Sequence, residues 1–546
     1  MKKKMNMAAA ILLSSVMAVS AGFAAIPAVA ADPTYTITMS TTANHTYTAY
    51  QVFAGVLHEE TTGTGESAVT TKTLTNVTWG SGVDGTALLA ALKSSTANPT
   101  YYADFENCDS AAKVAKVLEG YNNDSAQIKA IAKIIEAHKA TGTTTLTGLA
   151  AGYYLITDTT TTLPTDADGK TSDTYSSFIL RVVDNVEVTA KDGTVESHKT
   201  VTETDDTTPT TTPDQKVADY DIGDAVPYKL TFKLPSNYAE YVNYPITFTD
   251  DMCAGLTWDG NATIYYGSSD TTGTDIQFTT TTGSSYYGGQ KWTFTTPDLK
   301  TESGLTAGSV VTVIYNATLD SDAAINNDGN ENKYHVTFYS NPNVSTTPGP
   351  NDTTTPPPPT NDTPDDTTVV FTYELVFNKV DENKGALAGA NFKLEKNVGG
   401  TWTDVTALHT GEGAINPTLT DKTTGADVTP GTTTSFSFKG LDAGSYKLTE
   451  TATPNTYNSI DPITFEVVAT KSSVAVTGLS STSLTMTSKF DDDDAKLSAD
   501  IENKKGSVLP STGGIGTTIF YVVGGSLVGL AVVLLITKRR MNAKEK

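Results

Sequence analysis

Short segments that alternate apolar and polar side chains recur along most of this chain of 546 residues. Examples are 228–234 (Tyr-Lys-Leu-Thr-Phe-Lys-Leu), 310–316 and 373–380. An alternation with a period of two is typical of strands with one buried face. Turn residues separate such segments at spacings of roughly 8–12 residues, which favours β-sandwiches. The sequence therefore predicts a mainly β protein.

The composition argues against several classes of function. The chain carries 37 Lys and Arg against 61 Asp and Glu, a net charge of −24. An acidic surface repels phosphates, so we expect no binding of nucleic acid. The 2 cysteines, Cys108 and Cys253, form no cluster with histidines, so we expect neither a metal site nor a cofactor. The sequence contains no phosphate loop and no serine elbow, which argues against an enzyme acting on an external substrate.

Residues 1–31 have the features of a secretory signal peptide. Lys2, Lys3 and Lys4 form a basic start, 7–23 is small and apolar, and Ala28-Val29-Ala30 fits a cleavage site. A retained membrane anchor is the alternative, but the apolar run is short for that. We expect the mature chain to be secreted and to begin near Ala31 or Asp32.

Three signals follow one another at the C-terminal end, 509–546. Leu509-Pro510-Ser511-Thr512-Gly513 precedes the charge-free run 515–537, which is long enough to span a bilayer. Lys538, Arg539 and Arg540 then hold the tail in the cytoplasm. This order resembles the sorting signal of Gram-positive surface proteins that sortases attach to the cell wall. The resemblance implies that a sortase cysteine attacks the carbonyl of Thr512 and releases Gly513 onward, so the helix anchors the chain only transiently. A plain single-pass protein is the alternative.

Between these ends the sequence divides into three β-rich domains. Segment 345–368 is rich in Pro and Thr and predicts an extended linker. We expect an N-terminal domain at 32–190 with two or three inserted short helices, a middle domain at 191–344 and a third domain at 369–508. The predicted fold is three tandem immunoglobulin-like sandwiches, with a cleaved signal peptide and a C-terminal transmembrane helix.

The third domain carries the motif Tyr446-Lys-Leu-Thr-Glu450-Thr, followed by Pro454 and Tyr457. It resembles the E-box of Gram-positive pilins and of collagen-adhesin B-type domains. In that family a lysine in the first strand bonds to an asparagine in the last strand, an acid assists, and ammonia is released. The resemblance implies Lys379 and Asn503 as the partners and Glu450 as the acid. An ordinary Lys–Glu pair is the alternative.

Burial explains why this chemistry uses these residue types. An apolar environment lowers the pKa of a lysine, so its amine becomes a neutral nucleophile. The same environment raises the pKa of a carboxyl, which then stays protonated and polarises the amide carbonyl. Because the fold holds the two partners in contact, the reaction is unimolecular.

The middle domain contains a second candidate set. Lys199 lies in Ser-His-Lys-Thr-Val, Asp250 lies in Phe-Thr-Asp-Asp-Met, and Asn341 lies in Tyr-Ser-Asn-Pro. This set resembles a pilin domain in which a lysine joins the asparagine of a Tyr-Ser-Asn segment. The resemblance implies a bond from Lys199 to Asn341 with Asp250 assisting, although Asp251 is adjacent. A solvated Lys199 and a turn-capping Asp250 form the alternative. The first domain has no lysine in its first strands, so we expect no such bond there.

Lys191 ends the segment Val-Glu-Val-Thr-Ala-Lys at the junction of the first two domains. The segment is similar to the pilin motif, whose lysine accepts the sortase-activated threonine of the next subunit. Val182 replaces the aromatic residue of that motif, and Thr189-Ala190 replaces Tyr-Pro. The resemblance implies Lys191 as the acceptor between subunits; a solvated linker lysine is the alternative.

The resemblance as a whole is to a major, or backbone, pilin of a sortase-assembled pilus. It implies a structural protein fixed covalently to the Gram-positive cell wall. Its partners would be pilus-assembling and wall-anchoring sortases, other copies of the chain, peptidoglycan, and minor pilins or a host ligand. A monomeric wall-anchored adhesin, a minor pilin and a wall-bound enzyme are the alternatives. The sequence identifies neither the host ligand nor the sortase, and it leaves open the state of the cysteines and glycosylation of the linker.

Overall fold

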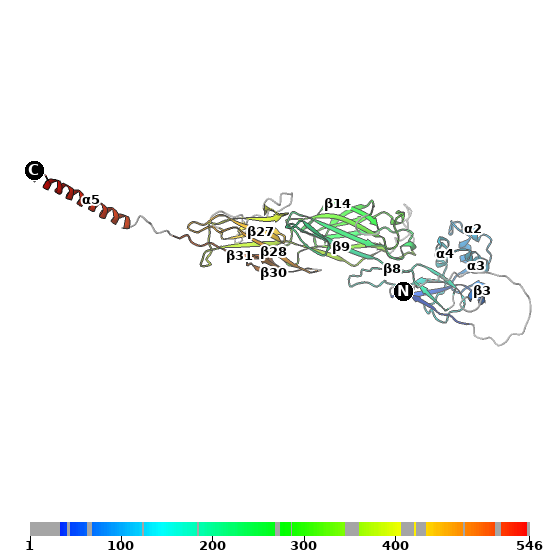
Figure 1. Cartoon of the computed structure of the whole chain (residues 1–546). Coiled ribbons are helices and arrows are strands. Elements are labelled where there is room, and N and C mark those ends of the chain that lie inside the picture. Colours follow the sequence, from blue (N-terminus) through cyan, green and yellow to red (C-terminus); the bar gives the residue numbers. More distant parts are fainter. Residues whose placement is uncertain are drawn as a thin grey trace, which may run out of the picture.

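The computed structural model describes residues 33–40, 44–62, 68–122, 125–182, 185–267, 273–285, 287–343, 360–405, 420–421, 433–472, 475–507 and 515–542. Three β-rich units follow one another along a line, and helix α5 (Ile515–Asn542) lies beyond the third unit (Figure 1). The predicted mainly β class is confirmed.

The first unit is a four-stranded antiparallel sheet with short helices packed against it. The strand order is β3 (Val69–Trp79), β2 (Tyr47–Thr62), β4 (Gly152–Asp158), β6 (Ile179–Val182). Four helices lie between β3 and β4 where we expected two or three: α1 (Gly85–Leu92), α2 (Tyr102–Phe105), α3 (Ala111–Glu119) and α4 (Ala126–Ala137). Ile131 and Ile135 recur on one face of α4 and are buried against Leu155 of the sheet. Two small pairs complete the unit: β1 (Ile37–Ser40) with β7 (Val186–Thr189), and β5 (Asp173–Thr174) with β8 (Gly193–Thr194).

The middle unit is a sandwich of two sheets. The first sheet has the strand order β10 (Thr210–Gln215), β9 (Glu196–Asp205), β12 (Ala225–Lys233), β18 (Val310–Leu319), β14 (Leu256–Gly267), β15 (Thr274–Asp275). The second has the order β11 (Val217–Asp219), β21 (Asp366–Phe371), β19 (Asn330–Tyr339), β13 (Thr247–Cys253), β17 (Gly288–Thr295), β16 (Thr279–Ser284), and β20 (Thr360–Asp362) also pairs with β19. Two short 3-10 helices are η2 (Tyr238–Glu240) and η3 (Leu299–Thr301). Alternate residues such as Leu230, Val313 and Val336 point inward and form the core.

The C-terminal part of the predicted linker 345–368 belongs to the middle sandwich. Strands β20 and β21 both pair antiparallel with β19, and β21 also pairs parallel with β11. The sequence of β21, Asp-Thr-Thr-Val-Val-Phe, is rich in β-branched residues, which favour a strand. Residues 345–359 of the linker lie outside the described residues.

The third unit is a sandwich of two smaller sheets. One sheet has the order β25 (Thr420–Asp421), β26 (Ser435–Leu441), β22 (Tyr373–Val380), β31 (Ala495–Glu502), β30 (Thr487–Phe490). The other has the order β24 (Thr401–Asp404), β23 (Asn391–Val398), β27 (Gly444–Ala452), β28 (Ile463–Lys471), β29 (Val476–Thr482). The first strand, β22, and the last, β31, lie side by side and run parallel.

The middle and third units share a closely packed boundary. The backbone N–H of Ile222 donates to the carbonyl of Gly440 at 2.9 Å, and that of Ala495 donates to Ile325 at 3.0 Å. Gly440 has a φ of +77°, and a Cβ there would lie 2.6 Å from the Ile222 side chain. Only glycine allows both this conformation and this close approach.

An ionic cluster lies at the same boundary. Nζ of Lys396, from the third unit, is 2.6 Å from Asp206, 2.6 Å from Asp221 and 2.5 Å from Asp442. The Lys396 side chain is 0% exposed. Burial alone would lower the pKa of Lys396, but the charges of Asp221, Asp442 and Asp206 outweigh burial and hold this pKa well above its usual value. The ammonium therefore stays charged and occupies the centre of the three carboxylates.

We predict that Lys396→Ala destabilises the boundary by about 3–5 kcal/mol, because the buried carboxylates lose their cation. Calorimetric melting of the mature chain, 32–512, measures this effect. Lys233→Ala is the matched control, since its partner Glu196 is exposed and the pair contributes less than about 1 kcal/mol. Equal melting of the two variants would contradict the prediction.

Candidate functional sites

The third unit brings Lys379, Glu450 and Asn503 together. Lys379 lies near the end of β22, and Asn503 directly follows the adjacent strand β31. Nδ2 of Asn503 donates to Oε1 of Glu450 at 2.8 Å. Nζ of Lys379 donates to the backbone oxygens of Val380 and Ile501 at 3.0 and 2.9 Å. The backbone N–H of Asn503 donates to the same Val380 oxygen at 3.0 Å, so the amine and the amide lie at one place in the sandwich.

The environment of this cluster suits a reaction of the lysine amine. Lys379 and Asn503 are both 0% exposed. Burial lowers the pKa of Lys379, and the charge of Glu450 opposes this only in part. Glu450 contacts the amide nitrogen, whereas Oδ1 of Asn503 has no hydrogen-bond partner among the described residues. Glu450 thus contacts the amide whose nitrogen would leave as ammonia, and its predicted role as the assisting acid stays a prediction.

The middle unit holds a second cluster between its two sheets. Lys199 and Tyr315 come from β9 and β18 of one sheet, and Asp250 and Asn332 come from β13 and β19 of the other. Nζ of Lys199 contacts Oδ2 of Asp250 and lies 3.0 Å from the Tyr315 hydroxyl. That hydroxyl donates to the same Asp250 oxygen at 2.8 Å and accepts from Nδ2 of Asn332 at 2.9 Å. The exposed fraction is 5% for Tyr315 and 0% for the other three residues.

Burial brings the pKa of the Lys199 amine toward neutral pH. Burial lowers the pKa of Lys199 to about 8, although the charge and hydrogen bond of Asp250 oppose the shift. The amine faces the ring of Tyr228, 4.9 Å from its centroid, and this ring stacks on Tyr315 at 5.2 Å. Deprotonating the Lys199 ammonium costs about 1.4 kcal/mol for each unit by which its pKa exceeds the pH of the solution. This free-energy cost is small at neutral pH.

Asn341, the predicted partner of Lys199, lies outside this cluster. It follows the end of β19, and the stretch from Asn332 to Tyr339 alone spans roughly 23 Å at the rise of a strand. Oδ1 of Asn341 accepts from the N–H of Asn343 at 3.0 Å. The predicted pairing is therefore corrected, because the structure brings Asn332 to the lysine and leaves Asn341 at the far end of the strand.

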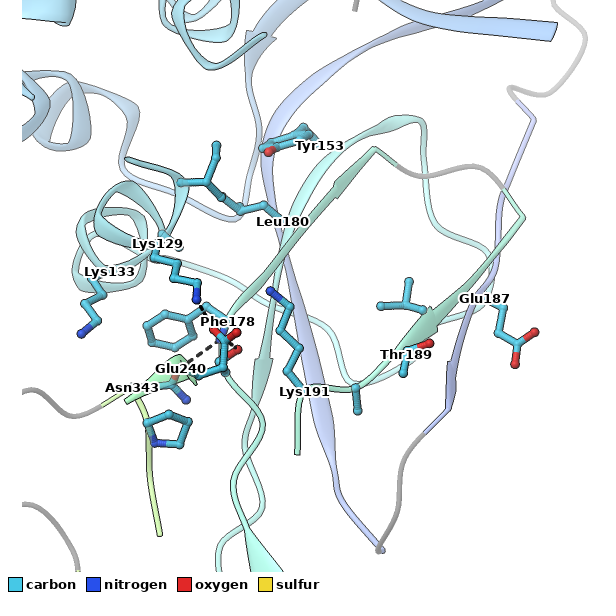
Figure 2. Close-up of a pocket in the computed structure, with 16 residues that line it drawn as sticks. Lys129, Lys133, Tyr153, Phe178, Leu180, Glu187, Thr189, Lys191, Glu240 and Asn343 are labelled. Atoms are coloured by element: carbon cyan, nitrogen blue, oxygen red, sulfur yellow. Dashed lines mark hydrogen bonds and ion pairs between the residues drawn. The ribbon is translucent and has the colours of Figure 1, made fainter. Parts of the chain in front are cut away.

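Lys191 lines a pocket at the junction of the first and middle units. The pocket has a volume of about 380 Å³ and is bounded by α4, β6, β7 and η2. Figure 2 shows the Lys191 side chain extending into the same pocket as Lys129, Phe178 and Glu240. Nζ of Lys129 lies 3.1 Å from Glu240, which ties the two units together across the pocket. The structure thus places Lys191 in a recess between units, and its role as the acceptor stays a prediction.

The pocket also contains Lys133, which the sequence did not single out. Burial lowers the pKa of Lys133 and so favours its neutral form. Lys133 is therefore the natural competitor of Lys191 for an acyl group, and it serves below as the matched control.

Hydrogen bonds fix the backbone around Lys191 from both units. Its N–H donates to Oγ of Ser176 at 2.8 Å, and its carbonyl accepts from Nδ2 of Asn237 at 3.0 Å. The N–H of Ser176 donates to Asp158 at 2.9 Å, and Nδ1 of His45 lies 2.6 Å from the same Asp158 oxygen. Nε2 of His45 is 3.7 Å from a carboxylate oxygen of Asp192, the residue after Lys191. The imidazole therefore lies between two carboxylates that flank the lysine-bearing segment.

The signal peptide, 1–31, and the residues Leu509, Pro510, Thr512 and Gly513 lie outside the described residues. Helix α5 includes the segment Thr518–Met541, which is 24 residues long and contains an 18-residue window with a mean hydropathy of 2.6. By length and composition this segment can cross a membrane.

Three family models match the chain in the order of its units. The Gram-positive pilin backbone subunit 2, Cna-B-like domain, matches residues 222–342. The SpaA prealbumin-like fold domain matches 373–480, and the LPXTG cell wall anchor motif matches 501–543. Each of these models matches one part of the chain: two match β-rich units, and the third matches the C-terminal end. The anchor and the apolar helix support a secreted pilin attached to the cell wall.

The chain is also similar to a curated surface protein and to several solved pilin structures. The trypsin-resistant surface T6 protein of Streptococcus pyogenes serotype M6 is 25% identical over 384 residues, which are 58% of this chain and 65% of that protein. The chain thus spans slightly less than two thirds of this relative. The solved T6 backbone pilin is 17% identical with a TM-score of 0.48, covering 88% of this chain and 100% of that chain. The major pilin SpaD of Corynebacterium diphtheriae is 18% identical with a TM-score of 0.41, covering 68% and 86%.

The His45 cluster predicts a pH dependence. Burial alone would lower the pKa of His45, but the hydrogen bond and charge of Asp158, with the charges of Asp192 and Asp173, raise this pKa above 6.5. A raised histidine pKa adds stability that is complete below pH 6.5 and is lost as pH rises through the folded-state pKa.

We therefore expect the melting temperature of the chain to fall more steeply than that of His45→Gln as the pH rises above 6.5. The difference between the two melting curves isolates His45 from other groups that titrate in this range. A difference that stays constant with pH would contradict the prediction.

Proposed function

We propose that the chain is the structural backbone subunit of a covalently polymerised pilus, stiffened by an internal Lys–Asn bond in each of its last two domains. One observation carries the proposal: two tandem pilin domains each hold a fully buried lysine and a fully buried asparagine in one cluster with an acid. The proposed bonds join Lys199 to Asn332 and Lys379 to Asn503. Lysines and asparagines are seldom buried together in an apolar core without a specific reason.

The bonds would determine how the shaft carries tension. Lys379 and Asn503 lie on the first and last strands of the third domain, so a bond between them keeps a pull on the two ends from separating those strands. Lys199 and Asn332 lie on opposite sheets of the middle domain, so a bond there holds the sandwich closed. Such bonds would take the place of disulfides in a chain whose two cysteines, Cys108 and Cys253, are free.

Polymerisation would use the two ends of the folded region. A pilus-assembling sortase cleaves after Thr512 and transfers its carbonyl to Lys191 of another copy, and a wall-anchoring sortase joins the base to peptidoglycan. The pocket around Lys191 supports this role, because it places an amine in a recess between two units. The proposed function is structural, and the only reaction that the chain itself carries out is the formation of its internal Lys–Asn bonds. Minor pilins and a host ligand are further partners proposed for the pilus.

Intact mass tests the internal bonds. We expect the mature chain to be lighter than its sequence mass by two molecules of ammonia. Asp250→Ala, Glu450→Ala and Asn332→Ala should each restore the mass of one ammonia, after allowance for the substitution itself. Asn341→Ala is the matched control and should keep both bonds. A wild-type chain at its full sequence mass would refute the internal bonds.

Immunoblotting of the cell wall tests polymerisation. After release with muramidase and boiling in detergent, wild-type protein should form a high-mass ladder, and Lys191→Ala should abolish it. Lys133→Ala alters the same pocket and should leave the ladder intact. A ladder lost only in Lys133→Ala would move the acceptor to that residue. A single wall-attached band in every strain would indicate a monomeric adhesin.

A further inference from the structure

We infer that Tyr315 is a catalytic residue for bond formation in the middle domain, where it relays a proton from Asp250 to the departing amide nitrogen of Asn332. The inference rests on the proposed bond between Lys199 and Asn332. It adds a group that the sequence did not suggest, since tyrosine does not belong to the lysine–acid–asparagine set.

The geometry of the two clusters differs at one point. In the third domain the acid Glu450 contacts the asparagine nitrogen directly, at 2.8 Å. In the middle domain the Tyr315 hydroxyl contacts the asparagine nitrogen at 2.9 Å and the acid, Asp250, at 2.8 Å. The hydroxyl therefore occupies the position between the acid and the leaving group. It is also 3.0 Å from the attacking amine of Lys199, so it touches both reacting nitrogens.

A tyrosine hydroxyl can relay a proton because it donates and accepts at the same oxygen. Burial, together with the charge of Asp250, holds the pKa of Tyr315 well above its usual value, so the hydroxyl keeps its proton. The ring is fixed by stacking on Tyr228 at 5.2 Å. The hydroxyl is thus neutral, oriented and shielded from water.

The protons of the reaction balance as follows. Asp250 takes one proton from the Lys199 ammonium, and the neutral amine attacks Cγ of Asn332. The Tyr315 hydroxyl, which donates to Asp250 before the reaction, turns toward Nδ2 and gives it this proton, while the Tyr315 oxygen takes the proton held by Asp250. The carbon–nitrogen bond to Nδ2 breaks, and ammonia leaves. The new amide nitrogen keeps one lysine proton, and the third proton passes to Asp250 and then to solvent. Tyr315 ends the cycle unchanged.

Tyr315→Phe tests this role because it removes the hydroxyl and keeps the ring. The mature chain is expressed briefly, harvested at intervals and analysed by intact mass. We expect at least a tenfold lower fraction with the middle-domain bond at the earliest harvest, since a positioned proton donor contributes roughly 10²–10⁴ in rate. The unbonded form is heavier by one ammonia. The bond of the third domain, in the same molecule, should form at the normal rate.

Tyr334→Phe is the matched control. Its hydroxyl is also in the middle core but donates to the backbone oxygen of Thr231, at 2.8 Å. The Tyr334→Phe variant should therefore form both internal bonds as quickly as wild type. If Tyr315→Phe forms its bond as quickly as this control, the relay is refuted.

Two further outcomes are distinguishable. If wild-type protein lacks the middle-domain bond, the proposed bond fails and the relay fails with it. If Tyr315→Phe does not fold by circular dichroism, 3-fluorotyrosine at position 315 keeps the ring and the hydroxyl but makes the hydroxyl more acidic. A change in the pH dependence of bond formation then supports the relay, and an unchanged dependence refutes it.

Discussion

The burial of a lysine amine inside an apolar sandwich is the constraint on which this structure depends. A buried ammonium costs several kcal/mol even beside a carboxylate, because neither ion keeps its hydration. Lys199 and Lys379 are both fully buried, and burial lowers the pKa of each. Conversion of the amine and an amide into a new neutral amide would remove the ammonium from the core. Folding would then promote bond formation, because folding buries the ammonium and the reaction removes the desolvation cost of that burial. The bond would in turn stabilise the fold.

Lys396 shows why burial alone does not make a lysine reactive. It is as deeply buried as Lys199, but three carboxylates surround it and raise its pKa, whereas Lys199 contacts the single carboxylate of Asp250 and has a pKa lowered to about 8. The number of carboxylates thus separates a lysine with a raised pKa, Lys396, from one with a lowered pKa, Lys199. Lys396 serves to hold the middle and third units together, and β21, drawn from the predicted linker, continues the middle sheet directly into that boundary.

Local patterns in the sequence predicted the elements but not all of the contacts. Alternation identified the strands, and the E-box identified Glu450, which the structure places beside Asn503. Asn341 was chosen from a short motif, although it follows the strand. Asn332 lies two residues before Tyr334 on the inward face of β19. The alternation of apolar and polar residues along this strand already indicates that both side chains point inward. Tyr315 and His45 could not be found in this way, because their roles depend on which strands face each other across the fold.

The most direct test of the central claim is tandem mass spectrometry of a protease digest of the mature chain. The account predicts one branched peptide in which the side chain of Lys199 is joined to that of Asn332 with loss of ammonia. A second branched peptide should join Lys379 to Asn503. Recovery of Lys199 in a linear peptide, or in a branched peptide with Asn341, would contradict the account.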